Sequence, residues 1–92
     1  MNILQTLSFK KSIKKLHANQ KKILDQSVKI IAVNPLVGEL KKGDLASIRV
    51  YKFQMLNSLV LLAYIYDEKM QTVTLLKMGS HENFYRDIKQ SS

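Results

Sequence analysis

Residues 59–66 read Leu-Val-Leu-Leu-Ala-Tyr-Ile-Tyr and form the longest unbroken apolar run in the chain. Candidate turns flank the run, at residues 55–58 before it and at residues 67–69 after it. A short apolar run between two turns is typical of a strand that is buried on both faces. Such a strand needs a neighbour on each side, so the run predicts a sheet with residues 59–66 at its centre.

The segments on either side of this run have the composition of strands. Residues 46–54 alternate between two sets of side chains, and residues 71–78 are again rich in β-branched and apolar side chains. The alternation places these residues on opposite faces of the first strand: Ile48, Val50 and Lys52 on one face, and Arg49, Tyr51 and Phe53 on the other. Together the three segments predict a three-stranded antiparallel meander.

The N-terminal half predicts a strand followed by two helices. Residues 2–7 read as a short strand, and Ser8 is a candidate cap for a first helix. Phe9, Ile13 and Leu16 recur at helical spacing and form one apolar stripe. Four lysines flank the stripe on its solvent side: Lys10, Lys11, Lys14 and Lys15.

The second helix is expected to begin at a cap on Asn19 and to end at Asn34, because the residue before a proline leaves the helical region. His17 then lies at the corner between the helices, as a surface cap rather than a ligand. A loop is expected at residues 36–45. The inner face of the helix is predicted to comprise these residues: Leu24, Ser27, Val28 and Ile31, with Ile23 and Ile30 at its margins.

A short C-terminal helix is expected over residues 82–90. The predicted fold is therefore α+β, with an N-terminal strand, an antiparallel two-helix hairpin, the meander and this final helix. The length of 92 residues is sufficient for one domain, spanning residues 1–92.

The net charge of +8 indicates an anionic partner, which is a nucleic acid, an acidic protein or a membrane surface. Nine lysines and three acids lie in residues 1–46, against six basic residues and four acids in residues 47–92. A solvated lysine-rich helix face explains the same excess. The chain contains no cysteine, which excludes disulfides and thiolate metal sites and is consistent with a reducing cytoplasm. We expect no transmembrane helix and no signal peptide.

The candidate for chemistry is the stretch after Gly79. His81 and Tyr85 are four residues apart, so they share one face if this segment is helical, and Arg86 adds a cation. RNA carries its own nucleophile, the 2′-hydroxyl, so an enzyme must move protons and stabilise the charge of the phosphorane. These side chains are suited to that task without a metal or another cofactor. The same cluster is also typical of a C-terminal cap on a small sheet.

Four blocks of the sequence carry a resemblance to a known family. They are residues 9–16, 34–38, 42–53 and 79–89, and the last has a Gly-x-His-x-x-x-Tyr pattern. The order of elements and these blocks resemble the RelE/ParE superfamily of toxins from bacterial toxin–antitoxin pairs. The last block resembles the messenger-RNA-cleaving branch. The resemblance implies a ribosome-dependent, metal-independent endoribonuclease of the cytoplasm, which a co-encoded antitoxin silences in a toxin–antitoxin hetero-oligomer.

The resemblance also implies roles for individual residues. His81 matches the position near the scissile phosphate, Tyr85 matches an aromatic residue that stacks on or orients the nucleotide, and Arg49 and Lys52 lie in a block of phosphate-binding residues. Several members carry an arginine on the second meander strand, where this chain has only apolar residues. Stabilisation of the transition state is then expected from Arg49, Lys52 or Arg86. We expect only one of Arg49 and Lys52 to face the site, and favour Lys52.

Ribosomal RNA is the expected partner of a second set of side chains: Lys10, Lys11, Lys14, Lys15 and Arg86. Two alternatives remain open at the level of sequence. One is a ParE-like toxin that inhibits DNA gyrase and cleaves no RNA. The other is a basic RNA- or protein-binding domain without catalytic activity, which the charge alone would explain.

Overall fold

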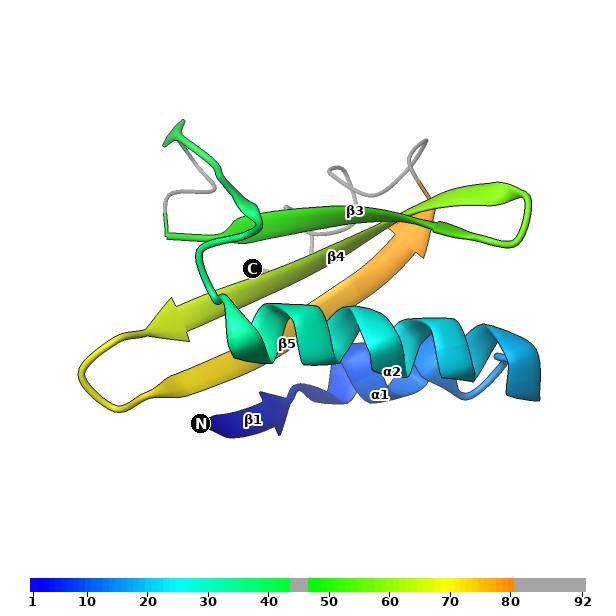
Figure 1. The fold of residues 1–92 in the computed structure, drawn as a ribbon, viewed down its shortest axis with the longest axis horizontal. Helices are drawn as coiled ribbons and strands as arrows, with labels where there is room; N and C mark the ends of the chain where they lie inside the picture. Colours follow the sequence, from blue (N-terminus) through cyan, green and yellow to red (C-terminus); the bar gives the residue numbers. More distant parts are fainter. Residues whose placement is uncertain (44–46, 81–92) are drawn as a thin grey trace.

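The computed structural model of the 92-residue chain describes residues 1–43 and 47–80. Within these residues the chain forms two helices and a five-stranded sheet, which confirms the predicted α+β class (Figure 1). The predicted C-terminal helix lies outside the described residues. In chain order the elements are β1 (Asn2–Gln5), α1 (Leu7–Ile13), α2 (Ala18–Val33), β2 (Glu39–Leu40), β3 (Arg49–Met55), β4 (Ser58–Asp67) and β5 (Thr72–Ser80).

The strands are ordered β1-β5-β4-β3-β2, so β4 lies at the centre of the sheet. β3, β4 and β5 form the predicted antiparallel meander, and β3 turns into β4 through the pair Met55 and Ser58. β1 pairs with β5 in parallel, which brings the first strand beside the last described one. Leu61 and Leu62 point to opposite faces of β4 and neither is exposed, which confirms the prediction of a strand buried on both sides.

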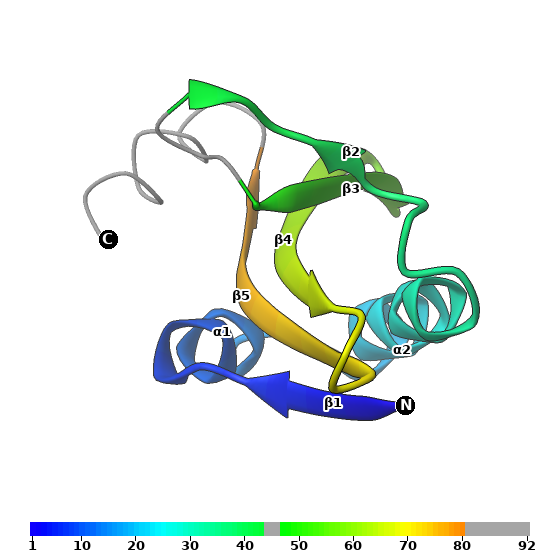
Figure 2. The same cartoon turned by 90° about the vertical axis from the view of Figure 1, so that its left-hand side faces the viewer.

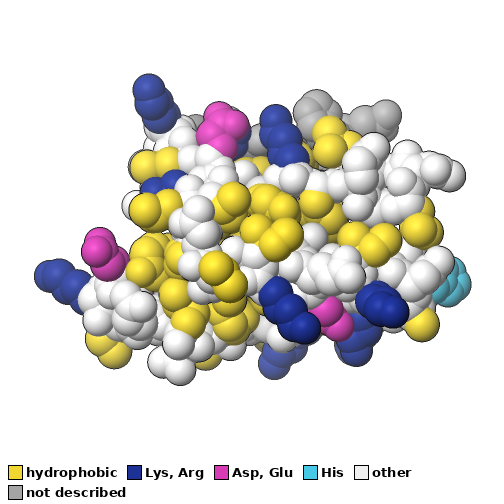
Figure 3. Space-filling model, viewed as in Figure 1, with side chains coloured by type: hydrophobic (Ala, Val, Ile, Leu, Met, Phe, Trp, Pro, Cys, Tyr) yellow, Lys and Arg dark blue, Asp and Glu magenta, His cyan; other side chains and the backbone are white. Residues whose placement is uncertain are grey.

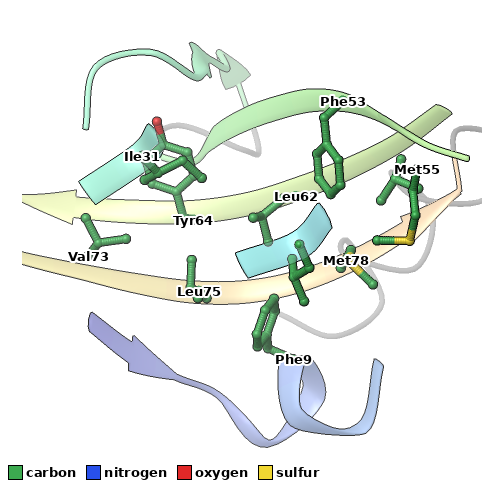
Figure 4. Close-up of a cluster of buried hydrophobic side chains, with 11 residues drawn as sticks. Phe9, Ile31, Phe53, Met55, Leu62, Tyr64, Val73, Leu75 and Met78 are labelled. Carbon is green, nitrogen blue, oxygen red and sulfur yellow. The ribbon is translucent and has the colours of Figure 1, made fainter. Parts of the chain in front are cut away.

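The main core lies between the sheet and the helices (Figure 4). α2 crosses one face of the sheet, which we call the front face, and α1 lies beside β5 (Figures 1 and 2). Full burial of one large apolar side chain contributes about 1.5–3 kcal/mol, so this cluster holds the layers together. Its buried members are Phe9 from α1, Leu24 and Ile31 from α2, and Phe53, Met55, Val60, Leu62, Tyr64, Val73, Leu75 and Met78 from the sheet.

The first helix begins earlier than the sequence predicted. Thr6, not Ser8, is its N-terminal cap, and the Thr6 hydroxyl accepts a hydrogen bond from the Phe9 amide at 3.1 Å. Ser8 lies inside the helix, and β1 ends at Gln5, two residues before the predicted end. Thr6 is the cap because it lies three residues before Phe9, and the burial of Phe9 fixes the rotation of the helix about its axis.

The second helix is capped by His17 and not by Asn19. The Gln20 side chain turns back and accepts a hydrogen bond from the His17 amide at 2.9 Å, so Asn19 lies within the first turn. The predicted end at Asn34 is confirmed, since the Asn34 amide makes the last helical hydrogen bond to Ile30. The side chain of Ile30 is 45% exposed, so its predicted place at the margin of the inner face was wrong.

The segment after α2 is more ordered than the predicted loop. Glu39 and Leu40 form β2, which pairs with the start of β3. The buried Tyr64 hydroxyl donates to the Pro35 carbonyl at 2.7 Å and accepts from the Gly38 amide at 2.8 Å. No local pattern in the sequence signals these bonds, because their partners are 26 and 29 residues apart.

A β-bulge interrupts the pairing of β4 with β5. Ala63 pairs with Lys77 but Tyr64 pairs with Leu75, so Leu76 has no partner on β4. The Leu76 carbonyl instead accepts a hydrogen bond from the Thr6 hydroxyl at 2.7 Å. The strand then continues to Ser80, whereas the sequence predicted that it would end at Met78, just before Gly79. Gly79 pairs with Leu61 inside the strand, and its φ is not positive.

Candidate functional site

The face of the sheet that is turned away from α2, which we call the back face, carries a second and smaller apolar cluster. Val50, Leu61 and Ala63 are its buried members, and Ile48 and Leu76 pack against them. Directly opposed residues of neighbouring strands place their side chains on the same face. The register therefore shows which polar side chains share the back face with this cluster.

Lys52 is one of them. It pairs with Leu61, and Leu61 pairs with Gly79, so the three residues form one row across β3, β4 and β5. The Lys52 side chain is exposed. A Cβ atom built on Gly79 would meet no heavy atom within 4 Å, so the β5 end of this row is open. The row thus has an exposed cation at its β3 end and an open position at its β5 end, where the strand leads into His81.

Arg49 belongs to the other side of β3. Its Nη1 donates to the Gly38 carbonyl at 2.9 Å and to the Leu36 carbonyl at 3.4 Å. These bonds fasten the segment after α2 to β3, so the guanidinium has a structural partner. The expectation that only one of Arg49 and Lys52 would face the site agrees with this arrangement, and Lys52 is the residue on the back face.

The remaining residues of the predicted site, His81, Tyr85 and Arg86, lie outside the described residues. The structure does show where the chain enters that segment. β5 ends at Ser80, which pairs with Val60 near the β3–β4 turn, and His81 is the next residue in the sequence. The strand end that precedes His81 is thus fixed by its pairing with the central strand.

The back face carries a second cation that sequence reasoning missed. Lys77 pairs with Ala63, a member of the back-face cluster, and its side chain is half-buried. In the sequence it lies within an apolar stretch whose strict alternation would have placed it in the front core. Only the bulge at Leu76 moves it to the back, and a bulge has no dependable signature in a single sequence.

The predicted ribosome-binding lysines are grouped at the end of α1. Lys10 and Lys11 lie in its last turn, Lys14 follows as the C-terminal cap, and Lys15 comes next; these side chains lie at the surface. An ion pair joins Lys41 to Glu39 at 3.2 Å, away from this group. Three lysines of α2 extend the basic surface: Lys21, Lys22 and Lys29. Figure 3 shows lysine and arginine side chains along the lower helical edge of the molecule.

The Tyr64 hydroxyl is a clearly perturbed titratable group. Burial raises the pKa of Tyr64 above its usual value of about 10, while the hydrogen bond from the Gly38 amide and the charge of Arg49 act in the opposite direction. The Tyr64 hydroxyl is therefore protonated at neutral pH, as its bond to the Pro35 carbonyl requires. Residues 1–43 and 47–80 contain no group of His, Asp and Glu side chains that could hold a metal ion.

In a comparison with protein families, a family model matches residues 3–89. The matching family is described as the ParE-like toxin of type II bacterial toxin–antitoxin systems. The chain belongs to this family. The resemblance to the RelE/ParE superfamily is thereby confirmed, and the protein is a toxin of the RelE/ParE kind. A comparison with proteins of curated function gives no match. No helix in the described part of the toxin is long and apolar enough to cross a membrane.

Solved structures of RelE toxins share the fold of this toxin. A mutant of the Escherichia coli RelE toxin in the free state superposes with a TM-score of 0.73 and 15% identity, covering 97% of this chain and 95% of that one. The toxin in the intact E. coli RelBE complex gives a TM-score of 0.70 and 17% identity, covering 88% and 96%. A RelBE complex of Mycobacterium tuberculosis gives 0.68 and 21%, covering 87% and 96%. Identities this low show a common fold.

Proposed function

We propose that the toxin is a ribosome-dependent messenger-RNA endonuclease that arrests translation. The observation that carries the proposal is the row of Lys52, Leu61 and Gly79 on the back face. It places an exposed cation on β3 in the same row as the end of β5, with β4 between them, and from that end the chain continues to His81 and Tyr85. A phosphate bound by Lys52 would thus lie near the segment that holds the two candidate proton-transfer residues.

The chemistry requires three actions on the RNA. The proton of the 2′-hydroxyl must be removed, the charge of the phosphorane must be stabilised, and the leaving 5′-oxygen must be protonated. A histidine titrates near neutrality, so His81 is suited to be the general acid or base, a role that gives about 10²–10⁴-fold in rate. Tyr85 offers a ring for stacking on the base and a hydroxyl for orientation.

The cations divide between two roles in this proposal. Lys52 stabilises the charge that develops on the phosphate, and Arg86 contributes from the C-terminal segment. Arg49 supports the site indirectly, because its guanidinium is bound to the segment that follows α2. The lysines at the end of α1 bind ribosomal RNA phosphates and position the toxin without reading sequence.

An acidic antitoxin is the second proposed partner, and it forms a hetero-oligomer with the toxin. Two of the similar structures are complexes of a RelE-type toxin with its antitoxin, and a third holds an antitoxin peptide. The surface at the C-terminal end of α2 supports such a contact, because Val33 is 88% exposed and Leu36 is 60% exposed. Exposed apolar side chains of this kind mark interaction sites, and the positive net charge favours an acidic partner.

A second candidate function follows from the family itself, whose description is ParE-like. A toxin of that branch would inhibit DNA gyrase, and its activity would not depend on His81. The two candidates therefore differ in their cellular target and in the effect of one substitution.

Expression of the toxin alone tests both candidates. We expect growth arrest with an immediate loss of translation, new messenger-RNA 5′ ends within codons, and unchanged DNA supercoiling. The His81→Ala variant should lose about 10²-fold or more in cleavage. For Tyr85, the Phe variant should be milder than the Ala variant if stacking is its main role. Altered supercoiling with continued translation, or full toxicity of His81→Ala, would favour gyrase inhibition.

A further inference from the structure

The bulge in β5 changes which side chains reach the back face. Without it, the pairing of Tyr64 with Leu75 would continue as Leu62 with Lys77, and the lysine would point into the front core. With Leu76 unpaired, Lys77 instead faces Ala63, and Met78 takes the core position opposite Leu62. A bulge that inserts one residue reverses the alternation of every residue that follows it.

The bulge is held by a contact from outside the meander. Thr6 donates its hydroxyl to the Leu76 carbonyl at 2.7 Å and its amide to the Leu75 carbonyl at 3.1 Å. Both carbonyls at the irregular position therefore have donors, so the register of the last part of β5 is fixed. Lys77 is accordingly held on the back face.

Within residues 1–43 and 47–80, no carboxylate forms an ion pair with Lys77 or Lys52. Neither ammonium forms an ion pair or a hydrogen bond with another of the described residues. β4, which lies between them, contributes only apolar side chains to these two rows, Leu61 and Ala63, and both are fully buried. From the strand spacings, the two lysine Cα atoms lie roughly 12 Å apart. Two flexible lysine stems can bring their charges to the same phosphate or to adjacent phosphates of a bound strand.

We propose that Lys77 is a second phosphate-binding residue of the toxin, and that the exposed Lys52 on β3 and the half-buried Lys77 on β5 together bind the backbone of single-stranded RNA from either side of β4. The proposal rests on the proposed RNA-cleaving function. It also accounts for the apolar second meander strand, where related toxins are expected to carry an arginine. In this chain the cation comes from the neighbouring strand, and the bulge brings it to the correct face.

A purely structural explanation exists for the same geometry. The bulge keeps a lysine out of the core, where an unpaired charge would be costly. That explanation predicts that a methionine at position 77 stabilises the fold or leaves it unchanged, with no effect on RNA. The phosphate-site proposal predicts the same stability but a loss of RNA binding. Measurement of RNA binding therefore distinguishes the two explanations.

The test uses the full-length toxin and a single-stranded RNA oligonucleotide whose 2′-hydroxyls are methylated, so that it is bound and not cut. Affinity is measured at several salt concentrations for the wild type and for Lys77→Met, Lys77→Arg and Lys69→Met. The methionine keeps the packing of the lysine stem. Lys69 lies exposed in the turn before β5 and is the matched control for loss of one charge.

We expect Lys77→Met to lower the slope of log affinity against log salt by about 0.7, the value for one phosphate contact on a single strand. Lys77→Arg and Lys69→Met should retain the wild-type slope. In cleavage of programmed ribosomes, Lys77→Met should be slower by about 10- to 100-fold, in keeping with the removal of one charged hydrogen bond. Its melting temperature should equal or exceed that of the wild type.

Two results would overturn the proposal: a wild type that binds no RNA, or a Lys77→Met slope equal to that of the wild type. A third result would show that the phosphate site exists and that the proposed endonuclease function is wrong. If the wild type binds RNA with a slope that depends on Lys77 but cuts no message on the ribosome, the phosphate site stands and the endonuclease assignment fails.

Discussion

Arg49 and Lys52 are three residues apart on β3 and lie on opposite sides of the sheet. Arg49 is bonded to the Gly38 and Leu36 carbonyls, whereas Lys52 is exposed in the row that leads to Gly79. One cation thus maintains the fold and the other is available to a ligand. The two residues therefore differ in their surroundings, although the sequence offers both as candidates.

Substitution of each residue should therefore change a different property. Arg49→Ala removes the bonds to two backbone carbonyls, and we expect it to lower the free energy of unfolding by about 1 kcal/mol. Lys52→Met should leave the melting temperature unchanged and slow RNA cleavage by about 10²-fold. Thermal melts and cleavage of programmed ribosomes measure the two effects. A stable Arg49→Ala variant with the larger defect in cleavage would reverse the assignment.

Thr6 joins the first helix to the bulge, so its hydroxyl has two roles. We expect Thr6→Val to cost about 1–2 kcal/mol, because the Phe9 amide loses its cap and the Leu76 carbonyl loses its donor. Thr6→Ser keeps the hydroxyl and should retain most of the stability. Urea unfolding of both variants gives the comparison. A Thr6→Val variant as stable as the wild type would show that the two hydrogen bonds of the hydroxyl do not contribute to stability.

Gly38 has no room for a side chain. A Cβ atom there would lie 2.6 Å from the Tyr64 hydroxyl oxygen and 2.8 Å from a ring carbon, and the ring is fully buried and cannot withdraw. We expect Gly38→Ala to cost about 1–3 kcal/mol, as overpacking does. Gly79→Ala is the matched control, since its Cβ meets nothing, and should be neutral or stabilising by about 0.5 kcal/mol. Chemical unfolding should separate the two; a Gly38→Ala variant as stable as Gly79→Ala would contradict the close packing of Tyr64 on Gly38.

Tyr64→Phe keeps the buried ring and removes the hydroxyl. The Gly38 amide and the Pro35 carbonyl then have no partner in Tyr64, and we expect a destabilisation of about 1–3 kcal/mol at neutral pH. The destabilisation should shrink at high pH. The pKa of Tyr64 is raised in the folded state, so above pH about 10 the unfolded chain releases this proton while the folded chain keeps it. The wild type is then destabilised as the pH rises, and Tyr64→Phe is not.

Unfolding by urea at pH values of about 8, 9 and 10.5, which bracket the usual tyrosine pKa, measures this dependence. The difference in stability between the wild type and Tyr64→Phe should be constant at the two lower values and smaller at the highest. A difference that grows with pH would mean that the folded pKa is lowered.

The lysines at the end of α1 should govern binding to the ribosome. Replacement of Lys10, Lys11, Lys14 and Lys15 by Gln should weaken ribosome binding and lower its salt dependence by about 0.7–0.9 in log–log slope for each phosphate that is no longer bound. Replacement of Lys21, Lys22 and Lys29 by Gln tests whether the α2 lysines share the effect. Sedimentation with ribosomes over a range of salt concentrations provides the slopes. An unchanged slope for the first variant would assign these lysines to solvation of the helix.

The predictable parts of this fold depend on patterns that are local in sequence. The apolar run at residues 59–66 predicted the central strand, and the spacing of Phe9 and Ile13 predicted the first helix, because burial acts on each residue of these patterns. β2 and the Tyr64 bond to Gly38 were missed, since both depend on contacts between segments that are distant in the chain. Lys77 was missed for the same reason: its face is decided by a bulge whose donor is 70 residues away.

For the candidate site, the sequence correctly predicted that Arg49 and Lys52 lie on opposite faces of β3. Strict alternation along β3 was sufficient for that conclusion, because no irregularity interrupts its pairing with β4. On β5, strict alternation predicts the wrong face for Lys77, because the β-bulge at Leu76 shifts the pairing with β4 by one residue. The roles of His81 and Tyr85 stay predictions, which the substitutions proposed for these two residues test.

The parallel pairing of β1 with β5 has a consequence for the order in which the toxin is made. Residues Asn2 to Gln5 find their partners only at Thr72 to Leu75, at the other end of the described chain. During synthesis the first strand must therefore wait until most of the polypeptide has left the ribosome, and Thr6 cannot fasten the bulge before then. The back face with Lys52 and Lys77 is completed last, so we expect a partly made toxin to be inactive toward the ribosome that produces it.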